Sequence, residues 1–186
     1  MSPERTLEGN ERLRLFVGLR LPADVVAGVV EWQAAALAGA PVRVVEPENL
    51  HVTIAFLGGR PAAELDAIES AVREAAKEAG RPLLQVARYR ETPRVGMLVL
   101  REREPRHAHR LAGDVMRRLQ ELGAYEPEKR DWTPHVTVAR FRAQPRLLPA
   151  LPHLGTISPS ELALYHSVLR PTGAQYAILE SVALGG

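Results

Sequence analysis

The sequence contains no cysteine, and this absence removes several kinds of chemistry at once. A chain without thiols forms no disulfides, has no thiol nucleophile and offers no thiolate ligands to zinc. No apolar run approaches the roughly 18 residues that a membrane-spanning helix needs. Residues 1–14 also lack the apolar stretch of a secretory signal. We therefore expect a cytoplasmic protein that makes no contact with a membrane.

Lysine is nearly absent too, since Lys77 and Lys129 are the only two, and the net charge is only +2. This balance does not favour a broad basic surface for nucleic acid, although one or two well-placed arginines are enough to bind a small anion. A chain of 186 residues can bury one core. We expect a flexible leader over residues 1–12 and a single bilobal, monomeric domain over residues 13–186.

Hydrophobic periodicity predicts an α+β protein of mostly antiparallel sheet with outer helices. Helices are expected over residues 22–38, 62–79 and 105–123, and the pair Gly58-Gly59 is expected to close the second strand. Strands are expected over residues 13–19, 50–57, 83–89, 95–101, 135–141, 161–170 and 175–183. The run RERE at 101–104 is interpreted as a solvated strand end.

The order strand, helix, strand occurs twice, and each copy ends in a similar motif. From Phe16 to His51 is 35 residues, and from Val99 to His135 is 36. This spacing predicts two pseudo-symmetric lobes whose paired strands line a central cleft, with coincidence as the alternative.

The repeated motif is HVTIAF, from His51, and HVTVAR, from His135. With six histidines and seven threonines, chance predicts about a quarter of one HxT triplet. In a strand the histidine and threonine share one face, about 6.5–7 Å apart, while the residues between them face the other way. Each strand therefore presents an imidazole and a hydroxyl to the cleft.

Two imidazoles and two hydroxyls suit cleavage of a phosphodiester without metal. One histidine can act as base toward the attacking oxygen and the other as acid toward the leaving oxygen. Thr53 and Thr137 can bind the equatorial phosphate oxygens as charge builds on them. Arg140 is the nearest cation to either motif and its guanidinium matches phosphate geometry, but strict alternation places it on the wrong face of its strand.

The chain resembles the two-histidine (2H) phosphoesterase superfamily, in particular the RNA 2′,3′-cyclic phosphodiesterases also called 2′-5′ RNA ligases. The resemblance runs over nearly the whole chain and is carried by RLFV in the first strand, NLHVTI with FLG, PHVTVAR, and the C-terminal LY, S, GA and Y at residues 14–17, 49–58, 134–140 and 164–176. It implies a 2H phosphoesterase fold. It also implies hydrolysis of 2′,3′-cyclic phosphates, on RNA 3′ ends or nucleotides, to 2′-phosphomonoesters. The resemblance also implies that neither metal nor cofactor is needed. It further implies a reverse reaction that seals a cyclic phosphate to a 5′-hydroxyl as a 2′-5′ linkage.

By the same resemblance His51 is the proton donor to the leaving 3′ oxygen, and His135 is the proton acceptor that activates water. The family's phosphate-binding arginine maps onto Arg140. The near symmetry of the two motifs leaves the donor and acceptor roles open when the residues alone are considered.

Phe16 shares the cleft face of its strand and has two interpretations, stacking on a terminal base or membership of a second small apolar cluster. His107 and His109 form an HxH pair without an evident third zinc ligand, so we expect them to be exposed. Two alternative functions remain, a 2H phosphoesterase for another nucleotide, such as a cyclic nucleotide or 2′-5′ oligoadenylate, and a non-catalytic RNA-binding or nucleotide-binding module.

Overall fold

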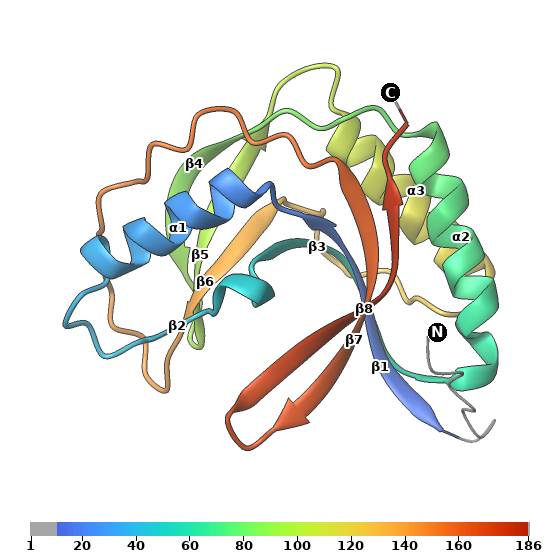
Figure 1. Cartoon of the computed structure of the whole chain (residues 1–186), viewed down its shortest axis with the longest axis horizontal. Helices are drawn as coiled ribbons and strands as arrows, with labels where there is room; N and C mark the ends of the chain where they lie inside the picture. The colour runs from blue at the N-terminus through green and yellow to red at the C-terminus, as the bar shows by residue number, and fades with distance from the viewer. Residues whose placement is uncertain (1–10, 186) are drawn as a thin grey trace.

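The computed structural model describes residues 11–185, which form one antiparallel sheet with three α-helices (Figure 1). The strands are β1 (Arg12–Arg20), β2 (Arg43–Val44), β3 (His51–Pro61), β4 (Leu84–Glu91), β5 (Val95–Glu102), β6 (His135–Arg140), β7 (Glu161–Arg170) and β8 (Gly173–Ala183). The helices are α1 (Ala23–Ala36), α2 (Leu65–Glu78) and α3 (His107–Glu121), with 3-10 turns η1 (Pro47–Asn49) and η2 (Ala62–Glu64). The predicted α+β class is confirmed, whereas the short strand β2 was not predicted.

The two HxT strands lie side by side at the centre of the sheet, as the repeat predicted. The strand order is β4-β5-β6-β3-β1-β7-β8, with β2 paired to β6. Within the described residues, the ladder between β3 and β6 is a single pair, Val52 with Val136. The sheet therefore consists of two halves, β2 with β4–β6 and β3 with β1, β7 and β8, which meet at the two motifs.

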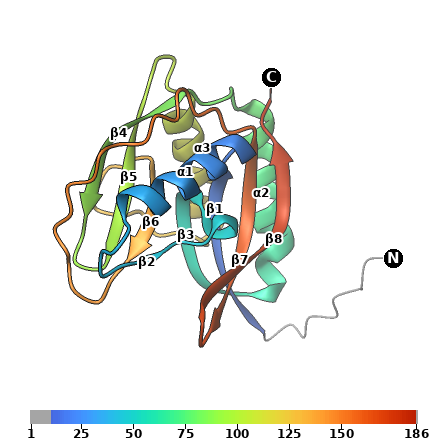
Figure 2. The same cartoon turned by 60° about the vertical axis from the view of Figure 1, so that its left-hand side comes forward.

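Each helix that connects the strands of one half packs against the other half. Helix α1 follows β1 but lies over β4–β6 in both views (Figures 1 and 2), where Trp32 approaches Tyr89 at 6.2 Å between ring centroids. Helix α3 follows β5 but contacts β3 and α2. This exchange interlocks the halves and fixes the relative position of the motif strands.

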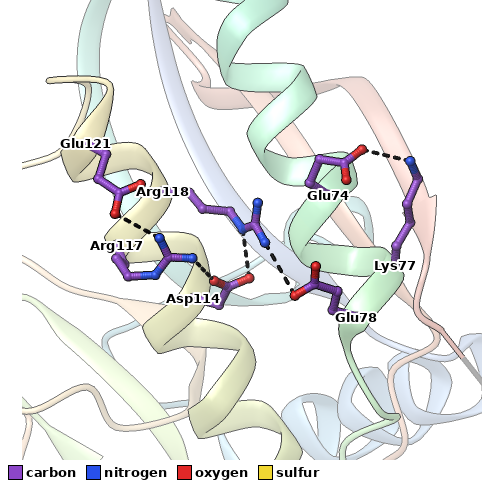
Figure 3. A network of polar contacts seen from close by, with 7 residues as sticks. All are labelled: Glu74, Lys77, Glu78, Asp114, Arg117, Arg118 and Glu121. Carbon is purple, nitrogen blue, oxygen red and sulfur yellow. Dashed lines mark hydrogen bonds and ion pairs between the residues drawn. The ribbon is translucent and has the colours of Figure 1, made fainter.

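Helices α2 and α3 are amphipathic, and their apolar faces supply much of the core. The inner face of α2 carries Ile68 and Val72, both fully buried, and the outer faces carry an ion-pair network that joins Glu78 on α2 to Arg118 on α3 at 3.4 Å (Figure 3). Surface ion pairs contribute at most about 1 kcal/mol each. Apolar burial therefore stabilises this helix pair more than its charges do. No helix within residues 11–185 has the length and apolar character to cross a bilayer.

The predicted end of the second strand was wrong. Strand β3 does not stop at Gly58-Gly59 but pairs with β1 as far as Pro61, because Gly58, at φ +65°, accommodates an irregularity in the ladder without ending it. The predicted leader spans residues 1–12. Its first ten residues lie outside the described part of the chain, and its last two lie within it. Of these, Glu11 accepts a hydrogen bond from the Ala62 amide at 2.8 Å and Arg12 begins β1.

The interpretation of residues 101–104 as solvated was also wrong at Glu102, whose side chain is 1% exposed. Its carboxylate accepts hydrogen bonds from the backbone amides of Ala108 and His109, and lies 2.6 Å from His109 Nδ1. A carboxylate at the start of α3 satisfies amides that have no partner within the helix and interacts favourably with the helix dipole. His109 is therefore only partly exposed, contrary to expectation.

Candidate active site

Residues of both motifs line one small pocket between the halves of the sheet. The pocket has a volume of about 100 Å³, and its lining includes Arg43, Asn49, His51, Thr53, Phe56, Thr137, Arg140 and Tyr176. His135 lies just outside this lining at a more exposed position of β6, yet it is near enough for its charge to lower the pKa of His51. Four of the five polar residues predicted for the site thus share a pocket, and the fifth lies beside it.

A β-bulge in each motif strand redirects the last residue of the motif. The ladder of β6 with β5 skips Val138, and the ladder of β3 with β1 skips Ile54. The two residues at each irregularity, Val138-Ala139 and Ile54-Ala55, are consecutive and buried, so the alternation of faces breaks there. Arg140 therefore turns into the cleft, against the prediction from strict alternation.

The corresponding bulge in β3 places Phe56, the counterpart of Arg140, in the pocket with 62% of its surface exposed. The sequence did carry a signal for this, because both motifs have two consecutive apolar residues where alternation requires one to be polar.

The two histidines have matching ring orientations. His51 Nδ1 lies 2.7 Å from the carbonyl oxygen of Asn49, and His135 Nδ1 lies 2.8 Å from that of Thr133. A carbonyl only accepts, so each Nδ1 carries a proton and each Nε2 is left to exchange protons in the cleft. In the neutral ring of His51, Nε2 accepts a hydrogen bond from the Thr53 hydroxyl at 2.8 Å.

His51 is neutral at pH 7. Burial is the main cause that lowers its pKa from 6.5 to about 4, and the positive charges of His135 and Arg140 lower it further. The hydrogen bond to the Asn49 carbonyl opposes this shift but does not outweigh it.

Phe16 packs against the His51 ring and has no exposed face on which a base could stack. Its ring is 2% exposed, stacks on Tyr165 with 4.6 Å between centroids, and lies 4.8 Å from the His51 ring. The predicted stacking of Phe16 on a terminal base is therefore corrected, because Tyr165 of the adjacent β7 covers the ring. The alternative holds, since Phe16, Ala163 and Tyr165 form a second small apolar cluster. Burial also raises the pKa of Tyr165 to about 12, so its hydroxyl stays neutral.

Gly18 makes room for the motif strand β3. A Cβ at this position would lie 2.9 Å from the carbonyl oxygen of Val52 and 3.3 Å from Cδ2 of His51. Only glycine therefore lets the imidazole lie so close to β1.

Two pocket residues had no assigned role in the sequence. The Asn49 amide donates to the carbonyl oxygen of Ala174 at 3.0 Å, and its Oδ1 is buried without a partner among the described residues. Arg43, from the unpredicted β2, donates to the carbonyl oxygen of Thr172 in the β7–β8 turn and brings a second guanidinium to the pocket. Neither position has a local sequence pattern that distinguishes it from the residues around it.

Side chains from outside the motifs hold both bulged strands in place. Gln33 on α1, 4% exposed, donates to the carbonyl oxygens of Val45 and Val138 at 3.1 and 2.8 Å. Trp132 donates its indole N–H to the carbonyl oxygen of Thr53 at 3.0 Å. Both donors satisfy carbonyls beside a bulge, where the ladder is interrupted.

Comparison with known proteins agrees with this geometry. A family model described as the 2′-5′ RNA ligase superfamily matches residues 22–169. The chain belongs to that superfamily. A Thermus thermophilus protein called RNA 2′,3′-cyclic phosphodiesterase is 35% identical to this chain, over 94% of this chain and 91% of its own length. A protein of the same name from Escherichia coli is 28% identical over 94% of this chain and 98% of its own.

The fold agrees with that of a solved structure as well. The crystal structure of the Thermus thermophilus protein TT0787 superposes with a TM-score of 0.79 at 31% identity, covering 94% of this chain and 99% of its own. The resemblance to the 2′-5′ RNA ligase superfamily that the two HxT motifs suggested is thereby confirmed, as is the predicted fold.

Proposed function

We propose that this protein hydrolyses the 2′,3′-cyclic phosphate at the 3′ end of RNA to a 2′-phosphomonoester. The observation that carries the proposal is the pair of imidazoles on neighbouring strands, each with Nδ1 held by a backbone carbonyl and Nε2 left for proton transfer. The names of the curated relatives support the same substrate. The proposal includes a monomeric cytoplasmic enzyme that needs no metal or cofactor.

In the proposed reaction, His135 Nε2 takes a proton from water as the water oxygen forms a bond to phosphorus. The bond from phosphorus to the 3′ oxygen breaks, and His51 Nε2–H gives its proton to that oxygen. Charge grows on the nonbridging oxygens, which the hydroxyls of Thr53 and Thr137 and the Arg140 guanidinium bind. The product keeps its phosphate on the 2′ oxygen.

The donor role of His51 requires the substrate. An imidazole whose pKa is about 4 is protonated in about one molecule in a thousand at pH 7. A phosphate anion in the pocket would offset the neighbouring positive charges and raise that pKa. Proton donation by His51 is thus coupled to phosphate binding.

Phe56 and Asn49 complete the proposed substrate contacts. Phe56 takes the stacking role once assigned to Phe16, because its ring is exposed in the pocket and every base has an apolar face. The unpartnered Asn49 Oδ1 is placed to accept a hydrogen bond from a ribose hydroxyl or a base amino group.

The test is incubation with adenosine 2′,3′-cyclic phosphate in excess chelator, with the products separated from 2′-AMP and 3′-AMP standards. We expect 2′-AMP alone. Parallel reactions that contain a 5′-hydroxyl RNA test for 2′-5′ ligation. Loss of turnover in chelator would refute the metal-free mechanism, and formation of 3′-AMP would refute the assignment of the leaving oxygen.

Substitution of either histidine tests the two-histidine assignment. His51→Ala and His135→Ala should each lower turnover by about 10²–10⁴-fold while the protein still folds. His153→Ala, at an exposed position outside the pocket, is the matched control and should keep wild-type turnover. Near-wild-type turnover in either active-site variant would end the assignment.

A further inference from the structure

A larger cavity of about 530 Å³ adjoins the reaction pocket between β1, β3 and the β7–β8 hairpin. We call it the Arg14 cavity, after the cation in its wall, and its lining includes Arg14, Phe56, Arg140, Ser167, Leu169 and Tyr176. Phe56, Arg140 and Tyr176 also line the reaction pocket, so the two hollows form one continuous trough.

The reaction pocket and the Arg14 cavity differ in volume and therefore suit ligands of different size. The reaction pocket, at about 100 Å³, is smaller than the roughly 300–1,000 Å³ of typical small-molecule sites, whereas the Arg14 cavity falls within that range. The reaction pocket has room for a phosphate group with part of its ribose. The remainder of an RNA end must therefore occupy the adjoining space.

The wall of the Arg14 cavity combines apolar surface with an arginine that has no partner among residues 11–185. Leu169 is 65% exposed and Phe56 62% exposed, and both line this one cavity, so its wall presents exposed apolar surface on two sides. Within residues 11–185 the Arg14 guanidinium forms no ion pair or hydrogen bond. This combination suits a nucleotide, which presents a flat base and a phosphate together.

The direction of the trough matches the side on which the RNA chain leaves the reaction centre. Phe16 contacts the His51 ring, and Arg14 lies two residues further along the same face of β1, about 6.5 Å beyond. His51 is the proposed donor to the 3′ oxygen of the terminal ribose. The terminal ribose, and the RNA attached to its 5′ oxygen, therefore lie on the side of Arg14, while water enters on the side of His135.

We propose that the Arg14 cavity is a second subsite, in which Arg14 binds the phosphate on the 5′ oxygen of the terminal nucleotide and the apolar wall receives the preceding nucleotide. A mononucleoside cyclic phosphate has no second phosphate and leaves Arg14 without a partner. The enzyme thus prefers RNA ends to cyclic mononucleotides. This inference rests on the proposed function.

Three substrates test the subsite, namely adenosine 2′,3′-cyclic phosphate, the same molecule with a 5′-phosphate, and the dinucleotide ApA with a terminal cyclic phosphate. We expect kcat/KM to rise up to about fivefold with the 5′-phosphate, as for an exposed ion pair, and again with the dinucleotide. The gain from the 5′-phosphate should shrink as salt is raised.

Substitutions in the wall of the Arg14 cavity test whether the rise in kcat/KM comes from this cavity. Arg14→Gln should remove the gain from the 5′-phosphate, and Leu169→Ser should reduce only the gain from the added nucleotide, while both variants turn over adenosine 2′,3′-cyclic phosphate as the wild type does. Arg88→Gln, an exposed arginine on β4 at the opposite edge of the sheet, is the matched control and should keep both gains.

The outcomes separate this inference from the proposed function. Equal kcat/KM for the three substrates, or a gain from the 5′-phosphate that survives Arg14→Gln, would overturn the subsite and leave the hydrolase assignment intact. If none of the three substrates is hydrolysed, both the proposed function and the subsite are overturned.

Discussion

Binding of a phosphate anion should raise the pKa of His51 toward 7, so that a large fraction of its imidazoles becomes protonated. Burial and two nearby positive charges lower its pKa to about 4, so about one molecule in a thousand carries the second ring proton at pH 7. The product 2′-AMP places a phosphate beside His51 without further reaction and is therefore a suitable ligand.

The size of the effect follows from the geometry of the pocket. The Thr53 hydroxyl lies 2.8 Å from His51 Nε2, so the charge of a phosphate bound by this hydroxyl lies about 4 Å from the ring. At an effective dielectric constant of about 20, that attraction is worth about 4 kcal/mol, or about a thousandfold tighter proton binding. About half of the His51 rings should then be protonated at pH 7.

The assay is an NMR titration of the ring resonances in histidine-labelled protein, with and without saturating 2′-AMP. His51→Gln assigns the signal by its loss. Arg140→Gln serves as an electrostatic control, because removal of a positive charge should raise the pKa of His51 in the free protein.

Two results would refute this reasoning. If His51 titrates near 6.5 in the free protein, its burial does not have the effect described. If its pKa does not rise when 2′-AMP binds, His51 cannot be the proton donor, and the role would pass to His135.

Further predictions concern folding and positioning. Gly18→Ala should lower kcat by about tenfold to a hundredfold, because the added Cβ displaces the His51 ring, while Gly113→Ala, in open space on α3, should not. Gln33→Leu should cost about 1–3 kcal/mol in urea unfolding, because two carbonyls lose a donor, and exposed Gln144→Leu should cost nothing measurable. As pH falls from 6.5 toward 4, the unfolded chain binds a proton at His51 that the native state does not, so wild-type stability should decline more steeply than that of His51→Gln. A parallel decline in the two proteins would contradict the low native pKa of His51.

The chemistry of the site could be predicted from the sequence because its signals are local. Two HxT triplets in apolar strands place an imidazole and a hydroxyl on one face, whatever the rest of the fold does. The repeated order of strand and helix also predicted that the two strands would meet, and the pairing of Val52 with Val136 confirms this. Helices and strands were found close to their predicted positions because their periodicity is strong.

Tertiary structure decided which side chains other than the two threonines turn toward the histidines. A bulge depends on the partner strand, so alternation predicted the wrong face for Arg140 and gave no role to Phe56. Coverage by β7 buried Phe16, and the buried amide of Gln33 reaches a β6 carbonyl 105 positions away. The sequence by itself determined the two imidazole and hydroxyl pairs, because those depend on neighbours two residues apart. The cation, the exposed ring and the pKa of His51 were decided by the tertiary structure, because they depend on which distant strands and helices pack together.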